Sequence, residues 1–280
     1  MATNIQDLKI NYAKAFGIHS VAAAVIFAIL YVPLFGWFVR QSLVRRNYVY
    51  VMLMIFCAIR ITAFAIRAAL AGMESAAENL NLLIADVVLS GVGYFGLLYS
   101  AYTLVLDLEL LTDRPPPRNP LLLLIRNRKV FRFALSAGVA LGIASATIDN
   151  GQSTTAKALH KVSVIVFLIL TVLQAFQTAM LARMDMAGGN QYKQGNQTFG
   201  RQHGIIILMF ISLLLLIREA FSAATLNNTS KANNEHFWYP LVAVPEILAV
   251  LLYSTPDLVP RREELPTNNT SYPLNTRPQQ

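Results

Sequence analysis

The sequence predicts an all-α membrane protein, a bundle of seven transmembrane helices with its N-terminus outside the cell and its C-terminus in the cytoplasm. The first observation is compositional: 55% of the 280 residues are hydrophobic and 14% are charged, whereas soluble proteins carry about 25% charged residues. The second is a set of seven apolar windows, each near the length of about 20 residues that a membrane-spanning helix requires. The third is the uneven distribution of lysine and arginine between the connections.

The seven windows divide the chain into one membrane domain with two flanking segments. They cover residues 16–38, 48–71, 80–105, 130–148, 162–181, 204–224 and 237–256. We therefore expect an extracellular N-terminus at 1–15, a seven-helix transmembrane domain at 16–256 and a disordered cytoplasmic tail at 257–280.

The basic residues predict the orientation of the bundle. Of the 23 Lys and Arg residues, 15 lie in the connections after the first, third and fifth windows and in the tail, while five lie in the other connections and the N-terminus. Cytoplasmic loops carry the excess of Lys and Arg in membrane proteins. The same bias explains the net charge of +8, so we predict no nucleic-acid partner. Among membranes, the plasma membrane is favoured over endomembranes.

Small residues indicate where helices pack closely. Gly138 and Gly142 form a G-x-x-x-G motif in the fourth window, and Ser90, Gly91, Gly93 and Gly96 cluster in the third. Lipid provides no hydrophobic drive for association, so close backbone approach matters more than it does in water. We assign these residues a structural role.

Six ionisable residues lie at hydrophobic depth and form the candidate site. An arginine at the centre of a membrane helix costs roughly 2.5–3.5 kcal/mol on insertion scales, and such residues usually face the bundle interior and pair with one another. The six are Arg60, Arg67, Asp86, Arg218, Glu219 and Glu246.

Depth along each window predicts the partners. Asp86 lies about two turns from its end of the third window, level with Arg67, and Glu246 lies near mid-membrane, level with Arg60. We expect Arg67 to pair with Asp86 and Arg60 with Glu246, and the adjacent Arg218 and Glu219 to find different partners. The pairs either line a polar binding or translocation path that opens outward, or only fix helix register.

The last window carries two prolines, Pro240 and Pro245, the second directly before Glu246. Each proline kinks the helix and frees a backbone carbonyl one turn earlier. Free carbonyls beside a carboxylate are suited to binding a ligand, because unpaired backbone is tolerated at membrane depth where it lines a cavity.

Motifs for catalysis are missing. The sequence has no H-E-x-x-H, C-x-x-C or G-x-S-x-G motif, and the last window has no lysine for a retinal Schiff base. Three histidines at the predicted outer face, His19, His160 and His236, could bind zinc together with Glu235 as in seven-span hydrolases, but histidines in such positions are usually solvated. We predict no catalytic residues, no metal and no cofactor.

The end of the chain, "IREAFSAATLNNTSKANNEHFWYPLVAVPEILAVLLYSTPDLVP", resembles that of the fungal lipid-translocating exporter family (aminocholesterol-resistance type). Residues that match in kind are Arg218, Glu235, His236, Tyr239 and Pro245. The chain departs from the pattern in the order of the His and Glu pair and in having Glu246 where the family is apolar. It also has Arg60 in the second span, where a glutamate is expected.

The resemblance implies a protein that binds or translocates a lipid or amphipathic small molecule, and not an enzyme. Membrane lipids and an unidentified lipid or small-molecule ligand are the implied partners. Tyr239, Pro240, Pro245, Glu235 and His236 are expected to support the six charged residues. The chain is also similar to fungal seven-span receptor-like proteins, whose second span can look like "CAIRITAFAIRAALAG". The alternatives are thus a receptor that engages a cytoplasmic signalling partner through its basic loops, or a membrane component of a biosynthetic pathway.

The charge distribution makes the topology testable. A reporter fused after Gln280 is expected to stay in the cytoplasm, and a tag before Met1 is expected to react with an impermeant reagent on intact cells, because the Lys- and Arg-rich connections stay inside. An externally accessible C-terminus would contradict the predicted orientation.

Overall fold

A computed structural model describes residues 11–45, 47–111, 127–148, 153–187 and 199–260. Within this part of the chain, seven helical segments are long and apolar enough to cross a membrane. They are α2 (Val21–Arg45), α3 (Tyr48–Gly72), α5 (Leu80–Leu110), α7 (Arg128–Thr147), α8 (Thr154–Ala187), α10 (Gly204–Ala224) and a final segment built from α12 (Glu235–Trp238), η2 (Tyr239–Ala243) and α13 (Val244–Tyr253). The predicted seven-helix bundle is confirmed, and the chain is an integral multi-pass membrane protein by helix length and hydropathy.

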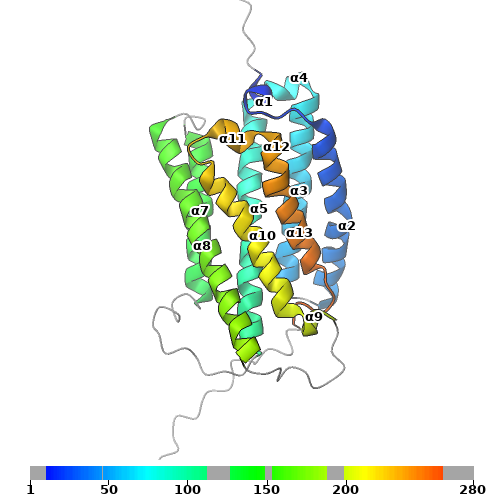
Figure 1. Ribbon diagram of the computed structural model, residues 1–280. Helices are drawn as coiled ribbons and strands as arrows, with labels where there is room; N and C mark the ends of the chain where they lie inside the picture. The colour runs from blue at the N-terminus through cyan, green and yellow to red at the C-terminus, as the bar shows by residue number, and fades with distance from the viewer. Residues whose placement is uncertain (1–10, 46, 112–126, 149–152, 188–198, 261–280) are drawn as a thin grey trace, which may run out of the picture.

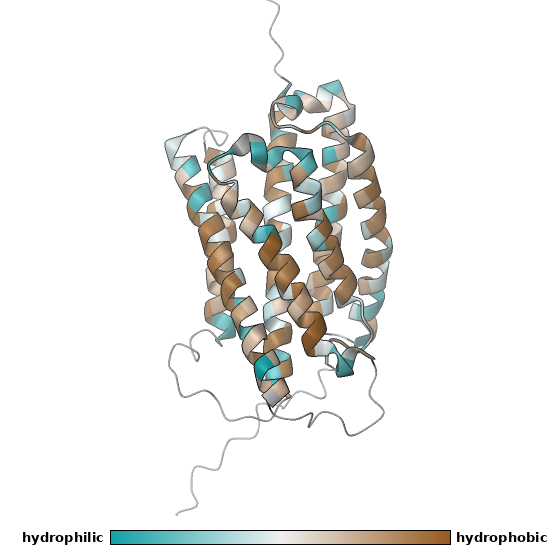
Figure 2. Ribbon diagram, in the orientation of Figure 1, coloured by the Kyte–Doolittle hydropathy of each residue, from teal (hydrophilic) through white to brown (hydrophobic). Residues whose placement is uncertain are grey.

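Short helices mark the two ends of the bundle. Figure 1 shows α1 (Tyr12–Ala15), α4 (Glu74–Ala77) and α11 (Thr229–Asn233) at the same end as α12, and α9 (Phe199–Gln202) at the opposite end. Hydrophobic residues dominate the middle of the long helices (Figure 2). The α9 end is the one that the sequence predicts to be cytoplasmic, and this assignment stays a prediction.

Helix α5 is the centre of the bundle. It packs against α3, α7, α8 and α10. The remaining two spans are farther out: α2 packs against α3, α13 packs against α10, and α2 and α13 contact each other. Residues Gly96 to Asp107 of α5 are all buried. A helix that is buried all round its circumference belongs at the core of its fold, so α5 positions the other helices that carry charges.

The first span begins later than predicted, at Val21 instead of residue 16. Gly17 has a φ of 82°, a left-handed conformation that glycine adopts without strain. The chain therefore turns between α1 and α2 instead of continuing as one helix. The predicted N-terminal segment is also partly folded, since Ala13 in α1 is only 1% exposed.

At the C-terminal end, the folded domain extends past residue 256, where the sequence predicts that it stops. Leu258 and Val259 are each 1% exposed, and the Asn47 side-chain amide donates to the carbonyl of Pro260 over 2.9 Å. Residues 257–260 thus belong to the folded domain and not to a disordered tail. The remainder of the predicted tail, 261–280, lies outside the described residues, as does most of the basic third connection, 112–126.

The last span departs from regular α-helix near its two prolines, while the kink that they predict stays a prediction. Residues 239–243 form a turn of π-helix between α12 and α13. Pro245 has no N–H to donate to the carbonyl of Leu241, and a wider turn is one way for a helix to accommodate such a lost bond. The π-helical turn ends at Ala243, so Glu246 lies in the first turn of the α-helix that follows.

The G-x-x-x-G motif packs α7 against α8, as predicted. The Ser163 hydroxyl of α8 donates to the Gly138 carbonyl over 2.7 Å, and a Cβ added at Gly138 would lie 3.3 Å from Val166 Cγ1. Gly93 lies against the Arg60 guanidinium in the same way, whereas nothing lies within 4 Å of a Cβ added at Gly91. The expected contact at Gly91 is therefore wrong.

These contacts make Gly138→Leu a test of the α7–α8 interface. We expect it to lower the stability of the protein by about 1–3 kcal/mol, because overpacking forces the helices apart. Thermal unfolding in detergent micelles measures the loss. Gly91→Leu is the matched control, since it adds the same side chain where space is open, and equal losses in the two variants would contradict the assigned interface.

Candidate functional site

Three spans meet at one carboxylate in the interior of the bundle. Glu246 Oε1 accepts a hydrogen bond from Arg60 Nη2 over 2.5 Å and another from Arg218 Nε over 3.2 Å. The predicted pairing of Arg60 with Glu246 is confirmed. The residues come from α3, α10 and α13, so a single oxygen atom joins helices that are far apart in the sequence.

Arg218 and Glu219 contact each other, which corrects the expectation that they find different partners. Arg218 Nη1 donates to Glu219 Oε2, and Arg218 Nε donates to Glu246. The expectation assumed that adjacent helical residues point apart, but the long side chain of Arg218 reaches the carboxylates of both Glu219 and Glu246. Arg60, Arg218, Glu219 and Glu246 thus form one network with two positive and two negative charges.

Aromatic and hydroxyl groups extend this network to α5 and α8. The Arg218 guanidinium carbon lies 3.8 Å from the centre of the Tyr94 ring, within the range of a cation–π interaction. The Tyr94 hydroxyl is 2.8 Å from the Thr171 hydroxyl. Tyr94 therefore serves both as a surface for the cation and as a polar contact to the next helix.

A second charged pair lies closer to the α12 end of the bundle. Arg67 Nη1 is 3.5 Å from Asp86 Oδ2, so the pair predicted from depth is confirmed. The Arg67 guanidinium carbon also lies 3.8 Å from the centre of the Trp238 ring and 5.7 Å from that of Tyr239. Because the ion pair is long and the aromatic contact is close, Trp238 contributes substantially to holding this arginine.

The residues that the sequence predicts to support the charged site lie at different places in the structure. Tyr239 lies beside Arg67, Pro245 is buried next to Glu246, and Pro240 and His236 are exposed. Glu235 serves a different purpose: its carboxylate accepts the backbone N–H groups of His19, over 3.0 Å, and Ser20, over 2.9 Å. It caps the start of α2 from the opposite end of the chain, which closes the ring of helices.

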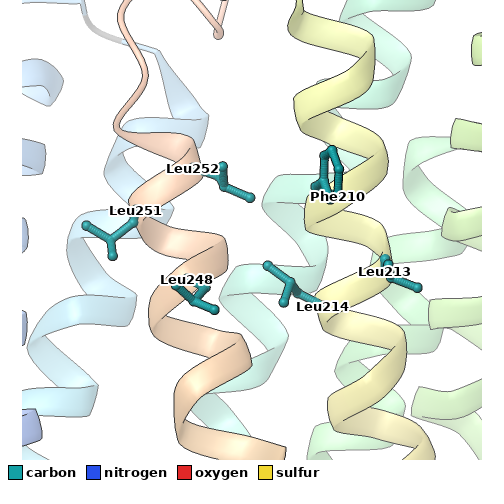
Figure 3. Close-up of a pocket in the computed structure, with 6 residues that line it drawn as sticks. All are labelled: Phe210, Leu213, Leu214, Leu248, Leu251 and Leu252. Carbon is teal, nitrogen blue, oxygen red and sulfur yellow. The ribbon is translucent and has the colours of Figure 1, made fainter.

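The six charged residues are buried in the interior of the bundle. Arg60, Glu219 and Glu246 are each 1% exposed, and Arg218, the most accessible of the six, is 9% exposed. One cavity lies between α10 and α13 (Figure 3) and another near α1 and α4, and none of the six residues lines either of these two. The outward-facing cavity that the sequence predicts stays a prediction.

Sequence reasoning missed a polar layer on the α9 side of the network. Gln174 Nε2 donates to the hydroxyls of Thr178, over 3.0 Å, and Ser212, over 2.9 Å. All three residues are buried, and Gln174 Oε1 finds no hydrogen-bond partner among the described residues. The spacing of Gln174 and Thr178, one turn apart in an apolar helix, is a signal that could have found this layer.

The comparisons with known proteins identify no family. No protein-family model, no curated protein and no solved structure matches the chain. In the part of the chain that the structure describes, no three or more His, Cys, Asp or Glu side chains are grouped so as to hold a metal ion. The assignment of a role therefore depends on the charged network itself.

The network is chemically suited to exchanging partners. The four charges of the network sum to zero. The attraction within each ion pair offsets part of the free energy that is lost when its members are removed from water. An incoming phosphate or carboxylate could replace Glu246 as the partner of an arginine. An ammonium group could likewise replace an arginine as the partner of a glutamate.

The shared oxygen makes a specific prediction for stability. Glu246→Ala leaves Arg60 without its carboxylate, and removing one partner of a buried ion pair costs roughly 3–5 kcal/mol. Adding Arg60→Ala is expected to recover part of that loss, because Arg218 keeps Glu219. Adding Arg218→Ala instead is expected to recover less, because Arg60 and Glu219 share no contact in the described network. Thermal unfolding in detergent measures all variants, and equal recovery in both doubles would contradict the shared-oxygen geometry.

The second pair is expected to couple more weakly. In a cycle of Arg67→Ala and Asp86→Ala, the double variant should recover part of the summed losses, but less than the Arg60 and Glu246 cycle does. The reason is that the pair is longer and Arg67 retains the Trp238 ring. Strictly additive losses, measured by the same unfolding assay, would show that the two side chains do not interact.

Proposed function

We propose that this protein binds or translocates a lipid or an amphipathic small molecule, whose polar headgroup exchanges with the charged network of Arg60, Arg218, Glu219 and Glu246. The observation that supports the proposal is the position of the network, at membrane depth and between α3, α10 and α13. A membrane bundle that needed only stability could pack these helices with small and apolar residues. Ionisable residues at this depth are expensive and usually functional.

The closed packing of the network favours alternating access over a permanent pore. Because Glu246 is almost fully buried, a headgroup reaches it only when α10, α13 or α3 moves. The π-helical turn η2 is proposed as the point where the α12 end of the last span bends. The proposed ligand therefore stabilises an open state by supplying the ion-pair partners that the closed state finds internally.

The outer pair is proposed to receive the headgroup first. Arg67 stacks on Trp238 and contacts Asp86 near the α12 end, and an arginine held by an aromatic ring can donate its free N–H groups to an anionic group. Membrane lipids and an unidentified small amphiphile are the proposed partners, the plasma membrane is the proposed location, and we propose no enzymatic activity.

A lipid flip assay in reconstituted vesicles tests the proposal. Vesicles with the protein are expected to translocate fluorescent phosphatidylcholine faster than empty vesicles. The double variant Arg60→Ala with Glu246→Ala should fold and lose this activity, because the headgroup no longer finds its partners. Arg45→Gln is the control, since Arg45 pairs with Asp257 at 2.7 Å near the α9 end, away from the network.

The outcomes separate transport from the alternatives. Full flip activity in the folded double variant would show that the charges only fix helix register. No flip in the wild type, together with recruitment of a G protein measured in parallel, would replace the transport proposal with the receptor alternative.

A further inference from the structure

Two buried hydrogen-bonding groups at the charged network have no partner. Arg60 Nε and the Tyr31 hydroxyl make no hydrogen bond among the described residues, although Arg60 is 1% exposed and Tyr31 is 0% exposed. Buried polar groups are almost always paired, and each exception needs an explanation. A guanidinium N–H can only donate, so the group that Arg60 Nε lacks is an acceptor.

Aromatic contacts place Tyr31 of α2 over Arg60. The Tyr31 ring lies 6.0 Å from the Phe56 ring and 5.9 Å from the Phe64 ring. Phe56 and Phe64 are one turn before and one turn after Arg60, so the three residues share one face of α3. The Tyr31 hydroxyl also interacts electrostatically with Glu246 and Arg60. It thus belongs to the surroundings of this ion pair.

The carboxylate of Glu246 lies where donors from two helices converge. Its Oε1 accepts hydrogen bonds from Arg60 Nη2 and Arg218 Nε. Guanidinium groups bind carboxylates and other anions through the same charge-assisted hydrogen bonds. When Glu246 releases the two arginines, their N–H groups join the unpaired Tyr31 hydroxyl and Arg60 Nε as donors without an acceptor.

We propose that Arg60, Arg218 and Tyr31 form a binding site for a small monovalent anion such as chloride, which enters when Glu246 takes up a proton. The anion replaces the carboxylate oxygen as the acceptor for both arginines, and the Tyr31 hydroxyl donates to it. This inference rests on the geometry of the network and not on the lipid of the proposed function.

The charges of the network favour one proton and one monovalent anion together. With Glu246 protonated, Arg60, Arg218 and Glu219 carry one net positive charge, and a single chloride makes the site neutral. Chloride beside an ionised Glu246 would leave one net negative charge in the interior, and sulfate beside a protonated Glu246 would do the same. Uncompensated charge at membrane depth is expensive, so the proton and the anion are expected to bind together.

Glu246 is the carboxylate whose protonation opens the site. It holds both arginines, whereas Glu219 holds only Arg218. Protonation of Glu246 therefore frees a donor on each of two helices, and protonation of Glu219 frees a donor on one. The titratable and charged groups that face Glu246 are Tyr31 from α2, Arg60 from α3, Tyr94 from α5, and Arg218 and Glu219 from α10.

Thermal unfolding of the full-length protein in detergent micelles tests the site. Sodium chloride replaces sodium gluconate, which has a much larger anion, at constant ionic strength. A ligand that binds only the folded protein raises its Tm. We expect chloride to raise the Tm of the wild type at pH 5 and to have little effect at pH 8, because a proton binds with each anion. Equal responses at the two pH values would overturn the proposal.

Glu246→Gln imitates the protonated carboxyl group. Chloride is expected to raise the Tm of this variant equally at pH 5 and pH 8, and sulfate at the same ionic strength is expected to raise it less. Adding Arg60→Ala should abolish the response, because Arg218 and Glu219 alone carry no net charge. A chloride response that survives in this double variant would place the anion elsewhere and overturn the assigned site.

Tyr31→Phe tests the unpaired hydroxyl in the Glu246→Gln background. We expect it to weaken the apparent chloride affinity several-fold, whereas Tyr253→Phe should leave the affinity unchanged. Tyr253 is a matched control, since it is also 0% exposed and its hydroxyl also has no hydrogen-bond partner among the described residues. It lies about 10 Å along α13 from Glu246. Equal effects of the two substitutions would show that Tyr31 does not contact the anion.

Anion binding and lipid transport are measured independently. A chloride response without flip activity would keep this site and reject the proposed function. Flip activity without a chloride response in either the wild type or Glu246→Gln would keep the proposed function and overturn the anion site.

Discussion

One oxygen atom of Glu246 holds the interior of this bundle together. It accepts hydrogen bonds from Arg60 on α3 and Arg218 on α10, and Arg218 in turn contacts Glu219 and the Tyr94 ring on α5. In the low dielectric of a membrane interior, an unpaired charge is expensive, so no member of this group can leave without changing the balance of the others. The relative positions of four helices are thus tied to a single electrostatic constraint.

Arg60 and Glu246 depend on each other. Arg60 lies in the second span and Glu246 in the last. The structure pairs these two residues. Each alone would leave an uncompensated charge at membrane depth, but together they are neutral, which explains how the chain carries both.

Polar and apolar surfaces are arranged so that the network stays isolated from lipid. Large hydrophobic side chains on α2, α8 and α10 are exposed at the surface of the bundle, while the charged network and the Gln174 layer are buried inside it. A closed interior of this kind is stable only while every charge has its partner. Under the proposed function, a ligand that supplies the same partners would shift the protein toward an open state.

The sequence alone determined the number of spans and most of their boundaries, because the length and hydropathy of a transmembrane helix are fixed by the bilayer. It also determined the pairs Arg67–Asp86 and Arg60–Glu246, since depth along an ideal helix can be counted from residue number. Counting gives depth but not the direction of a long side chain, so the contact of Arg218 with both Glu219 and Glu246 was decided by the tertiary structure. The same holds for the stacking of Arg67 on Trp238, for the Glu235 cap on α2 and for the nearly complete burial of the charged network. Each depends on which helices become neighbours around α5, and that choice is made by side-chain packing that hydropathy and charge do not encode.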